Sequence, residues 1–423
     1  MSDSGIPNAP DRTGAGRRPS RRGLAAISVI VALVLVEGAA RVSTPVLNRV
    51  MTFPVLDRQA LLARHVTGLE DLLEGEHRET LHPVYGCAYR PGWAHGADTI
   101  DAKGTRRSSA AGDRGALRLL AFGGSFVYCN EVSNAECWTA VLEERWDAVA
   151  VNYGVGGYGT DQALLRYLGE GGVDHGVVVI GYSSVNIRRV VNRYRGFMSS
   201  AEGPWFKPRF LPDGDGLRLV EAPVPDERAA RAFLSDPRAA LMEIGQEDYW
   251  YEPSRYEHRA YAWSAAYRLT SEAVGRVRRR WLDADRPFDG ALVNEESEAF
   301  EVQSRLLAAF ADSVRGRGAS PVLLFMPSPA DLARRQRGEE VSYAPLLVRM
   351  QDRGEVVLDV SPRLAAHREP SALLAQYGHY SPKGNALVAE AIAELLRLHP
   401  RAPPPDATPP AAQGAAGGGD PPS

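Results

Sequence analysis

The stretch LRLLAFGGSF, residues 117–126, decides the fold of this chain. Its first six residues form a short, mostly apolar run of the kind expected for a strand that is covered on both faces. Gly123 and Gly124 follow, and glycine lets the backbone turn sharply and approach a ligand closely. The pattern predicts that Ser125 stands at the end of a buried strand, with its hydroxyl directed out of the sheet towards a substrate.

Four further apolar runs and four helical patterns alternate along the chain after this stretch. The other predicted strands span 148–152, 177–182, 322–326 and 356–360, and the predicted helices span 138–145, 160–168, 300–314 and 387–398. Strands that alternate with helices favour a parallel sheet with helices on both faces. We therefore expect an α/β protein, a three-layer α/β/α sandwich with a central, mostly parallel five-stranded sheet.

Composition is that of an ordinary globular protein. The 423 residues are 44% hydrophobic and 24% charged, and the formal net charge is −3, so nothing points to a nucleic-acid partner. Three cysteines are too few for a disulfide scaffold, and their spacing fits no zinc site. In an exported protein Cys129 and Cys137 could form a bridge that rigidifies the loop after Ser125; the alternative is two small buried thiols.

The N-terminus indicates the cellular compartment. Four arginines between positions 17 and 22 precede an apolar run over 23–40 that is interrupted only by Glu37. Positive charge before such a run keeps that end in the cytoplasm and sends the rest across the membrane. We favour a transmembrane signal anchor over a cleaved signal peptide, because no clean small-x-small cleavage site follows. A buried core helix is a third interpretation, which the arginine-rich leader disfavours.

The predicted domain organisation follows from these patterns. Residues 1–22 are expected to be a disordered cytoplasmic leader, 23–40 the anchor or signal peptide, 83–398 the main α/β domain and 400–423 a disordered tail. A helical and aromatic insertion at about 195–294 interrupts the alternation of strands and helices. Its tryptophans either line an acyl or sugar pocket beneath a lid or form a small core of their own; these are Trp205, Trp250, Trp263 and Trp281.

Four blocks carry the candidate chemistry, in a fixed order along the chain. Ser125 follows the first strand, a glycine loop at 152–160 the second and an asparagine loop at 181–189 the third, while His379 precedes the last helix. This order of Ser, Gly, Asn and His blocks resembles the SGNH (GDSL-type) hydrolase family over roughly 83–398. The segment 86–93 also looks like the lead-in of membrane-anchored bacterial relatives.

The resemblance implies a role for each of these residues. Ser125 would be the nucleophile and His379 the base that takes its proton, since imidazole titrates near neutral pH. The oxyanion would be bound by the N–H of Ser125, the N–H of Gly157 and the amide of Asn186. Asn186 is displaced from the usual Gly-x-Asn-Asp pattern. In the alternative alignment Asn186 occupies the position of the aspartate that follows the asparagine, and Ser183 or Ser184 faces the pocket.

The acidic residue of the family pattern is missing. The family usually places an aspartate three residues before the histidine, and here Gln376 occupies that position. Two substitutes are open: a backbone carbonyl that orients the ring in a Ser–His dyad, or Asp359 at the end of the last strand.

The function implied is that of a membrane-anchored serine ester hydrolase, facing the periplasm or the cell surface, with an acyl-serine intermediate and no cofactor or metal. Its partners would be an ester-bearing small molecule, lipid or polysaccharide, and the membrane through the N-terminal helix. Two alternatives remain: an O-acyltransferase that modifies envelope polysaccharide, and an SGNH-like binding protein that has lost catalysis.

Overall fold

The computed structural model describes residues 21–50, 57–106, 117–170, 176–198, 203–257, 261 and 263–399. The predicted tail and all but the last two residues of the predicted leader lie outside the described residues. The chain divides into two compact units. One comprises Met1–Leu61 and Pro253–Val277, and the other comprises Leu62–Glu252 and Arg278–Ser423.

A five-stranded sheet forms the centre of the larger unit, and every pair of neighbouring strands in it is parallel. The strand order is β13-β12-β7-β5-β6. The bounds are β5 Leu117–Phe122, β6 Ala148–Asn152, β7 Val177–Tyr182, β12 Ser320–Phe325 and β13 Val357–Asp359. The prediction of five strands and a parallel sheet is confirmed, with the last strand shorter than expected because only three of its residues pair with β12.

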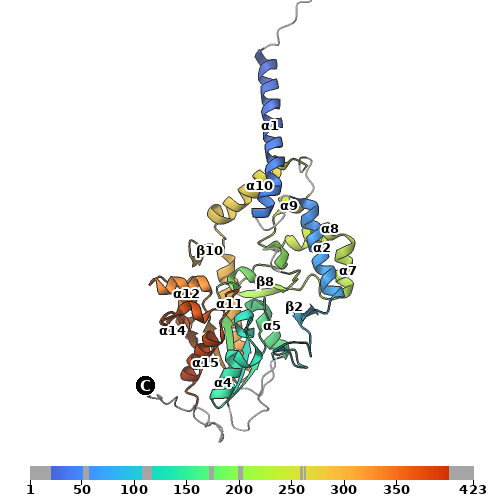
Figure 1. Ribbon diagram of the computed structural model, residues 1–423. Helices are drawn as coiled ribbons and strands as arrows, with labels where there is room; N and C mark the ends of the chain where they lie inside the picture. The colour runs from blue at the N-terminus through green and yellow to red at the C-terminus, as the bar shows by residue number, and fades with distance from the viewer. Residues whose placement is uncertain are drawn as a thin grey trace, which may run out of the picture. The chain divides into compact units, whose positions relative to one another are not determined.

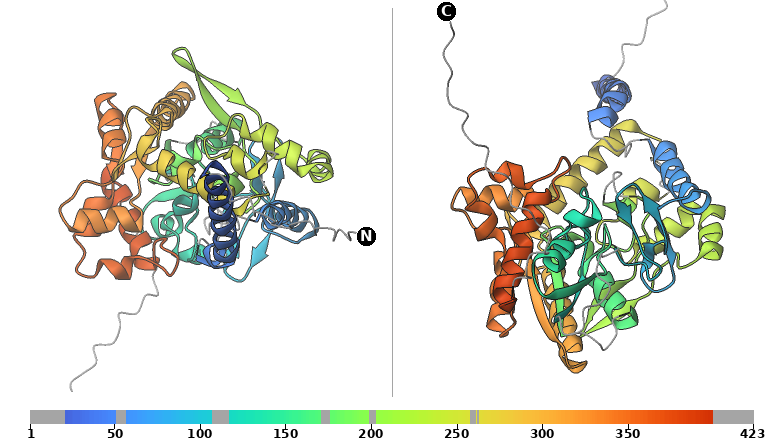
Figure 2. Two further views of the ribbon diagram at one scale, coloured as in Figure 1. Left: turned by 90° about the horizontal axis from the view of Figure 1, so that it is seen from above. Right: turned by 60° about the horizontal axis from the view of Figure 1, so that its bottom comes forward.

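Helices cover both faces of this sheet, so the unit is a three-layer α/β/α sandwich (Figure 1; Figure 2). On one face lie α5 (Thr160–Glu170), α11 (Glu298–Gly316) and α13 (Ala344–Asp352). On the other lie α4 (Trp138–Arg145), α12 (Pro329–Gln336), α14 (Ser361–Ala365) and α15 (Pro382–Leu396). The predicted helices are all present, and α15 begins as expected, with Ser381 Oγ accepting from the N–H of Gly384.

The region predicted as an insertion contains short helices and two hairpins. The bounds are η2 Arg195–Phe197, β8 Arg209–Asp213, β9 Gly216–Val220, α7 Glu227–Ser235, α8 Pro237–Gly245, α9 Pro253–Tyr256, α10 Ala265–Val277, η3 Arg278–Leu282, β10 Phe288–Asp289 and β11 Leu292–Val293. Phenylalanines rather than tryptophans are buried here, among them Phe206 and Phe233. Trp263 and Trp281 are 67% and 70% exposed, so these two do not form a core.

The remaining named elements precede the sheet or connect its parts. Their bounds are α2 Arg58–Glu74, β1 Glu79–His82, β2 Gly86–Tyr89, β3 Ala94–His95, β4 Asp98–Thr99, α3 Ser125–Tyr128, η1 Asn134–Glu136, α6 Asn186–Arg189 and η4 Pro370–Leu373.

Helix α1 (Arg21–Val50) is the one described helix that is long and apolar enough to cross a membrane. Its apolar side chains are exposed, Leu35 by 67%, so the interpretation as a buried core helix is wrong. Glu37, which interrupts the apolar run, accepts hydrogen bonds from the Ser264 hydroxyl and from the N–H groups of Ala265 and Ala266, at the start of α10 in the same unit. These bonds compensate the carboxylate for the water that an apolar environment would remove.

Candidate functional site

Ser125 is the first residue of α3 and lies just beyond the carboxyl end of β5, where the sequence predicts it. A glycine is required immediately before it. A Cβ atom at Gly124 would lie only 2.9 Å from the carbonyl oxygen of Tyr158, closer than real Cβ contacts allow. The serine turn and the glycine loop after β6 therefore approach each other at backbone contact, at the edge where parallel sheets of this kind bind ligands.

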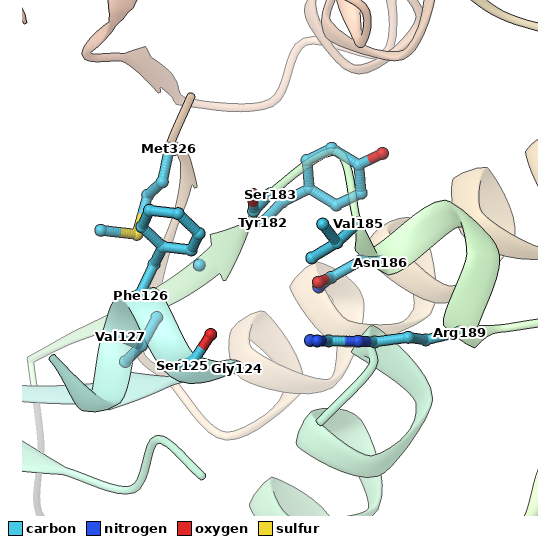
Figure 3. Close-up of a pocket in the computed structure, with 11 residues that line it drawn as sticks. Gly124, Ser125, Phe126, Val127, Tyr182, Ser183, Val185, Asn186, Arg189 and Met326 are labelled. Atoms are coloured by element: carbon cyan, nitrogen blue, oxygen red, sulfur yellow. The ribbon is translucent and has the colours of Figure 1, made fainter. Parts of the chain in front are cut away.

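A small pocket lies beside Ser125, with about 10 Å³ of free space, or about one water-sized sphere. Its polar side chains are Ser125, Ser183, Asn186 and Arg189, and Phe126 and Met326 contribute apolar walls (Figure 3). The wall residues come from the ends of β5, β7 and β12 and from α6. Among the described residues of 195–294, none lines it, so the expected lid contributes no wall to this pocket.

Asn186, a predicted oxyanion donor, begins α6 and lines this pocket with Ser125. Its amide nitrogen donates to Thr160 Oγ1 at 3.4 Å, while its Oδ1 lies 4.0 Å from a Cβ built on Gly124. Ser183 lines the pocket as well, whereas Ser184 donates to Asp331 Oδ2 at 2.6 Å. Of the two serines in the alternative alignment, the structure therefore places Ser183 at the pocket.

Gly157, the other predicted oxyanion donor, lies in the loop after β6 with φ of +88°, a left-handed conformation that favours glycine. It is not among the residues that line the pocket beside Ser125. Within the described part of the chain its N–H makes no hydrogen bond, so the group is available to a ligand. Its carbonyl accepts a hydrogen bond from Arg195, which fixes the orientation of the peptide.

His379 lies in the loop between η4 and α15, and its ring packs against Phe126, the residue next to Ser125, with ring centroids 5.1 Å apart. This contact places the histidine on the same side of the sheet as the serine. Its Nδ1 atom lies 2.7 Å from Glu131 Oε2. The side chains of His379 and Glu131 are only 20% and 13% exposed.

Glu131 is a site residue that the sequence analysis missed. Its carboxylate also accepts from the N–H groups of Tyr377 and His379, at 2.6 and 2.9 Å. Burial alone would raise the pKa of Glu131, but these two N–H donors and the imidazole outweigh it, so the pKa is lowered. Its contribution to stability is therefore present above the ordinary carboxyl pKa of 4.5 and is lost as pH falls below that value.

The two substitutes that the sequence suggested for the missing aspartate are wrong. Asp359 accepts hydrogen bonds from the hydroxyls of Tyr343 and Ser361, at 2.9 and 2.8 Å, and makes none with His379. The Nδ1 atom of His379 contacts a carboxylate rather than a backbone carbonyl. Gln376 is exposed. The family spacing between acidic residue and histidine could not identify Glu131, because it lies 248 residues before His379 and six residues after Ser125.

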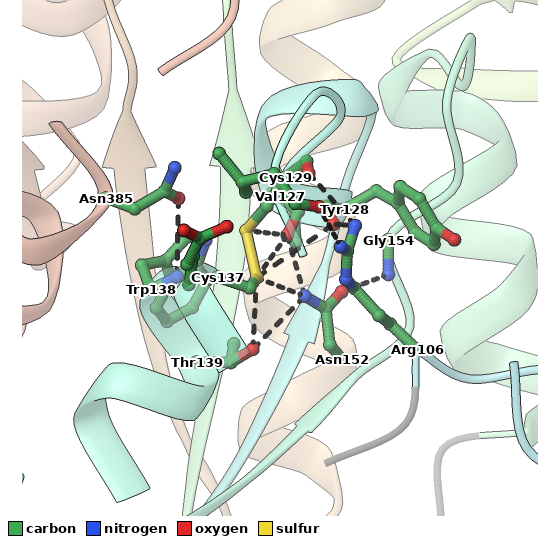
Figure 4. Close-up of a disulfide and its surroundings, with 12 residues drawn as sticks. Arg106, Val127, Tyr128, Cys129, Cys137, Trp138, Thr139, Asn152, Gly154 and Asn385 are labelled. Carbon is green, nitrogen blue, oxygen red and sulfur yellow. Dashed lines mark hydrogen bonds between the residues drawn. A yellow bond between two sulfur atoms is a disulfide. The ribbon is translucent and has the colours of Figure 1, made fainter. Parts of the chain in front are cut away.

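A disulfide between Cys129 and Cys137 closes the loop that carries Glu131, with Cα atoms 5.4 Å apart (Figure 4). Of the two alternatives for these cysteines, the structure contains the bridge. Cys129 and Glu131 have φ values of 64° and 73°, which are strained for residues other than glycine. Arg106 donates to the carbonyls of Tyr128 and Cys129, at 2.6 and 2.9 Å, and holds the start of the same loop.

Removing the bridge is expected to reduce stability. Replacing Cys129 and Cys137 together with serine should lower the free energy of unfolding by about 2.5 kcal/mol, the chain-entropy estimate for a loop this short. Urea unfolding measures the effect. Cys87→Ala is the control, since Cys87 is the free cysteine, and an equal loss of stability in that variant would contradict a specific role of the bridge.

Basic side chains surround the glycine loop behind the pocket. Arg189 Nη1 donates to the carbonyl of Tyr158 at 3.0 Å, and Arg195 donates to that of Gly157. Lys207 forms a fully buried ion pair with Asp161. Burial lowers the pKa of Arg189 to about 10, against the opposing effect of Asp161, so the guanidinium is still charged at neutral pH. The surroundings of the loop are therefore positively charged.

Among the residues that the structure describes, no group of three or more His, Cys, Asp or Glu side chains is placed to hold a metal ion.

Comparison with protein-family models finds no match for this chain, and comparison with curated proteins finds none either. Several solved structures are similar to it, and two of them illustrate the likeness. One is a lipolytic protein of the G-D-S-L family from Desulfitobacterium hafniense DCB-2, 13% identical with a TM-score of 0.30, covering 66% of this chain and 98% of that one. The other is a lipase/acylhydrolase from Enterococcus faecalis, 13% identical with a TM-score of 0.29, covering 68% and 100%. At these TM-scores the similarity does not support a conclusion about function.

Proposed function

We propose that this chain is an extracytoplasmic serine ester hydrolase of the SGNH type that acts through an acyl-serine intermediate. One observation carries the proposal. His379 packs against the residue next to Ser125, and its Nδ1 atom is bound to the carboxylate of Glu131. Nucleophile, base and orienting acid are the three groups that an activated serine requires.

In the acylation step, Ser125 Oγ attacks the carbonyl carbon of the ester while Nε2 of His379 takes the hydroxyl proton. The carbonyl oxygen becomes an oxyanion in the tetrahedral intermediate. When this intermediate collapses, the bond to the alcohol breaks and His379 returns its proton to the leaving oxygen. The acyl group is then held on Ser125, and the alcohol is the first product.

The deacylation step repeats this chemistry with water. His379 Nε2 removes a proton from the water, whose oxygen attacks the acyl carbon, and the histidine then protonates Ser125 Oγ as it leaves. Glu131 stays ionised throughout and stabilises the imidazolium that forms in both steps. Its lowered pKa favours this role, because the carboxylate keeps its charge at neutral pH.

The oxyanion needs donors that are already in place when charge develops. We assign the backbone N–H of Ser125 and that of Gly157 to this task. Neither group makes a hydrogen bond within the described residues. Asn186 is the side chain that the family pattern would add, and its position in the pocket with Ser125 supports a place at the site.

We place the catalytic unit outside the cytoplasm, anchored by α1. Its length and apolar composition, and the arginines before the run, support a signal anchor. The disulfide supports export as well, since such bonds persist mainly in oxidising compartments. The full chain should stay in the membrane fraction after an alkaline carbonate wash and be digested by protease added from outside; release by the wash would contradict the anchor.

The direct test of the proposed function is turnover of a small neutral ester, p-nitrophenyl acetate, by the full chain in detergent. We expect multiple turnovers with release of free acetate. The second candidate is the binding protein without catalysis, which is favoured by one observation: within the described residues, the hydroxyl of Ser125 makes no hydrogen bond to His379. Catalytic hydrogen bonds often tighten only when substrate binds. A folded protein without turnover would support that second candidate.

A further inference from the structure

We propose that Arg189 donates a charged hydrogen bond to the oxyanion, in the place that the SGNH pattern gives to an asparagine amide. This inference rests on the proposed function, because the oxyanion forms only when Ser125 attacks an ester. It adds a catalytic residue that the family pattern does not contain.

The position of Arg189 brings its guanidinium to the reacting serine. Arg189 is the last residue of α6, seven residues after the end of β7. Its Nη1 would lie 3.3 Å from a Cβ built on Gly124, the residue before Ser125. Figure 3 shows the guanidinium extending towards Ser125 across the pocket that both residues line.

Asn186 is turned so that it presents the wrong atom for an oxyanion donor. Its amide nitrogen is directed to Thr160 Oγ1, and the carbonyl oxygen of its side chain faces Gly124. Thr160 Oγ1 also accepts from the amide of Gln303 at 2.8 Å. An acceptor oxygen repels an oxyanion, so in this arrangement Asn186 does not supply the side-chain donor.

Most N–H donors of the Arg189 guanidinium make no hydrogen bond within the described residues. In the described part of the chain, its one hydrogen bond goes to the carbonyl of Tyr158, and no carboxylate forms an ion pair with it. The residue is nevertheless only 9% exposed. Burying a cation without a direct counter-ion costs free energy in the protein without substrate. An anion that forms next to this cation removes part of that cost and is therefore stabilised.

The place of the anion follows from the residues that line the pocket. Ser125 and Arg189 both line it, and its free space of about 10 Å³ has room for an oxygen-sized group. The oxyanion forms on the oxygen bonded to the carbon that Ser125 attacks, so it develops beside these residues.

The test compares Arg189→Gln and Arg189→Lys with Arg188→Gln. Arg188 lies on the same short helix but is exposed, with its guanidinium 5.8 Å from the ring centroid of Trp250. The substrate is p-nitrophenyl acetate, which carries no charge. We expect Arg189→Gln to lower kcat by about 10²- to 10³-fold with little change in KM, as for loss of one oxyanion donor. Arg189→Lys should lose less, and Arg188→Gln should stay within about twofold of the wild type.

A second measurement keeps the inference testable if turnover is slow. The rate of inactivation by a fluorophosphonate, which also develops charge on an oxygen near Ser125, should fall in parallel with kcat. Melting temperatures identify any variant that fails to fold. If Arg189→Gln does not fold, Arg189→Lys, which retains the buried positive charge, is compared with the wild type instead. An unchanged kcat in Arg189→Gln, or a rise in KM alone, would overturn the inference and leave the hydrolase intact. A wild type that neither turns over ester nor reacts with the fluorophosphonate would overturn both.

Discussion

Replacing Ser125 with alanine is expected to reduce kcat towards p-nitrophenyl acetate by about 10⁵-fold or more, while the melting temperature stays close to that of the wild type. The size of the loss follows from the mechanism, because without Oγ no acyl intermediate forms and only the remaining binding groups act on the ester. Ser125 is buried at the start of α3, and removal of one hydroxyl that makes no hydrogen bond within the described residues leaves the fold intact.

Ser183→Ala is the matched control for this variant. Ser183 lines the same pocket, is also buried and follows the neighbouring strand β7. It should retain most of the activity, because its hydroxyl makes no hydrogen bond to a base among the described residues. If Ser183→Ala lost turnover and Ser125→Ala kept it, the assignment of the nucleophile would be wrong.

Replacing Glu131 with glutamine is expected to lower kcat by about 10³- to 10⁴-fold. The side chain keeps its shape, and its one carbonyl oxygen can still accept from the N–H of Tyr377 or His379. The amide is neutral, however, so it no longer stabilises the imidazolium that forms when His379 takes the proton of Ser125. Its NH2 group must also face one of the N–H donors that the carboxylate accepts from, so at least one of these hydrogen bonds is lost. Steady-state turnover near neutral pH measures the effect.

Asp359→Asn distinguishes Glu131 from Asp359 as the carboxylate that orients His379. Asp359 is the carboxylate at the end of β13, and it binds Tyr343 and Ser361 rather than His379. This variant should keep kcat within a few-fold of the wild type, even where it loses stability. A large loss of kcat in Asp359→Asn, combined with normal turnover in Glu131→Gln, would restore Asp359 as the acid.

The sheet and its flanking helices could be predicted because their signals are local. Continuous apolar runs mark β5 to β7, and a serine followed by proline marks the start of α15. The edge strand β13 was overestimated, since hydrophobicity alone does not show how many of its residues find a partner. The exposure of Trp263 and Trp281 was missed for a related reason: aromatic content does not reveal which side chains a core reaches.

The site residues were predictable only where the order of motifs along the sequence identifies them. The blocks around Ser125 and His379 each follow or precede an element with a clear signal. Glu131 could not be found in this way, because its contact with His379 joins segments 248 residues apart through a strained loop closed by a disulfide. Arg189 was hidden for another reason, since an arginine at the end of a short helix normally points to solvent, and only the packing of α6 turns this one inward.

Labelling with a fluorophosphonate, with the modified residue mapped by mass spectrometry, tests the central claim most directly: that His379 and Glu131 activate Ser125. We predict one adduct per chain on Ser125 in the full-length wild type, none in Ser125→Ala, and strongly slowed labelling in His379→Ala and Glu131→Gln. A folded wild type that does not react, or an adduct on another residue, would contradict the account.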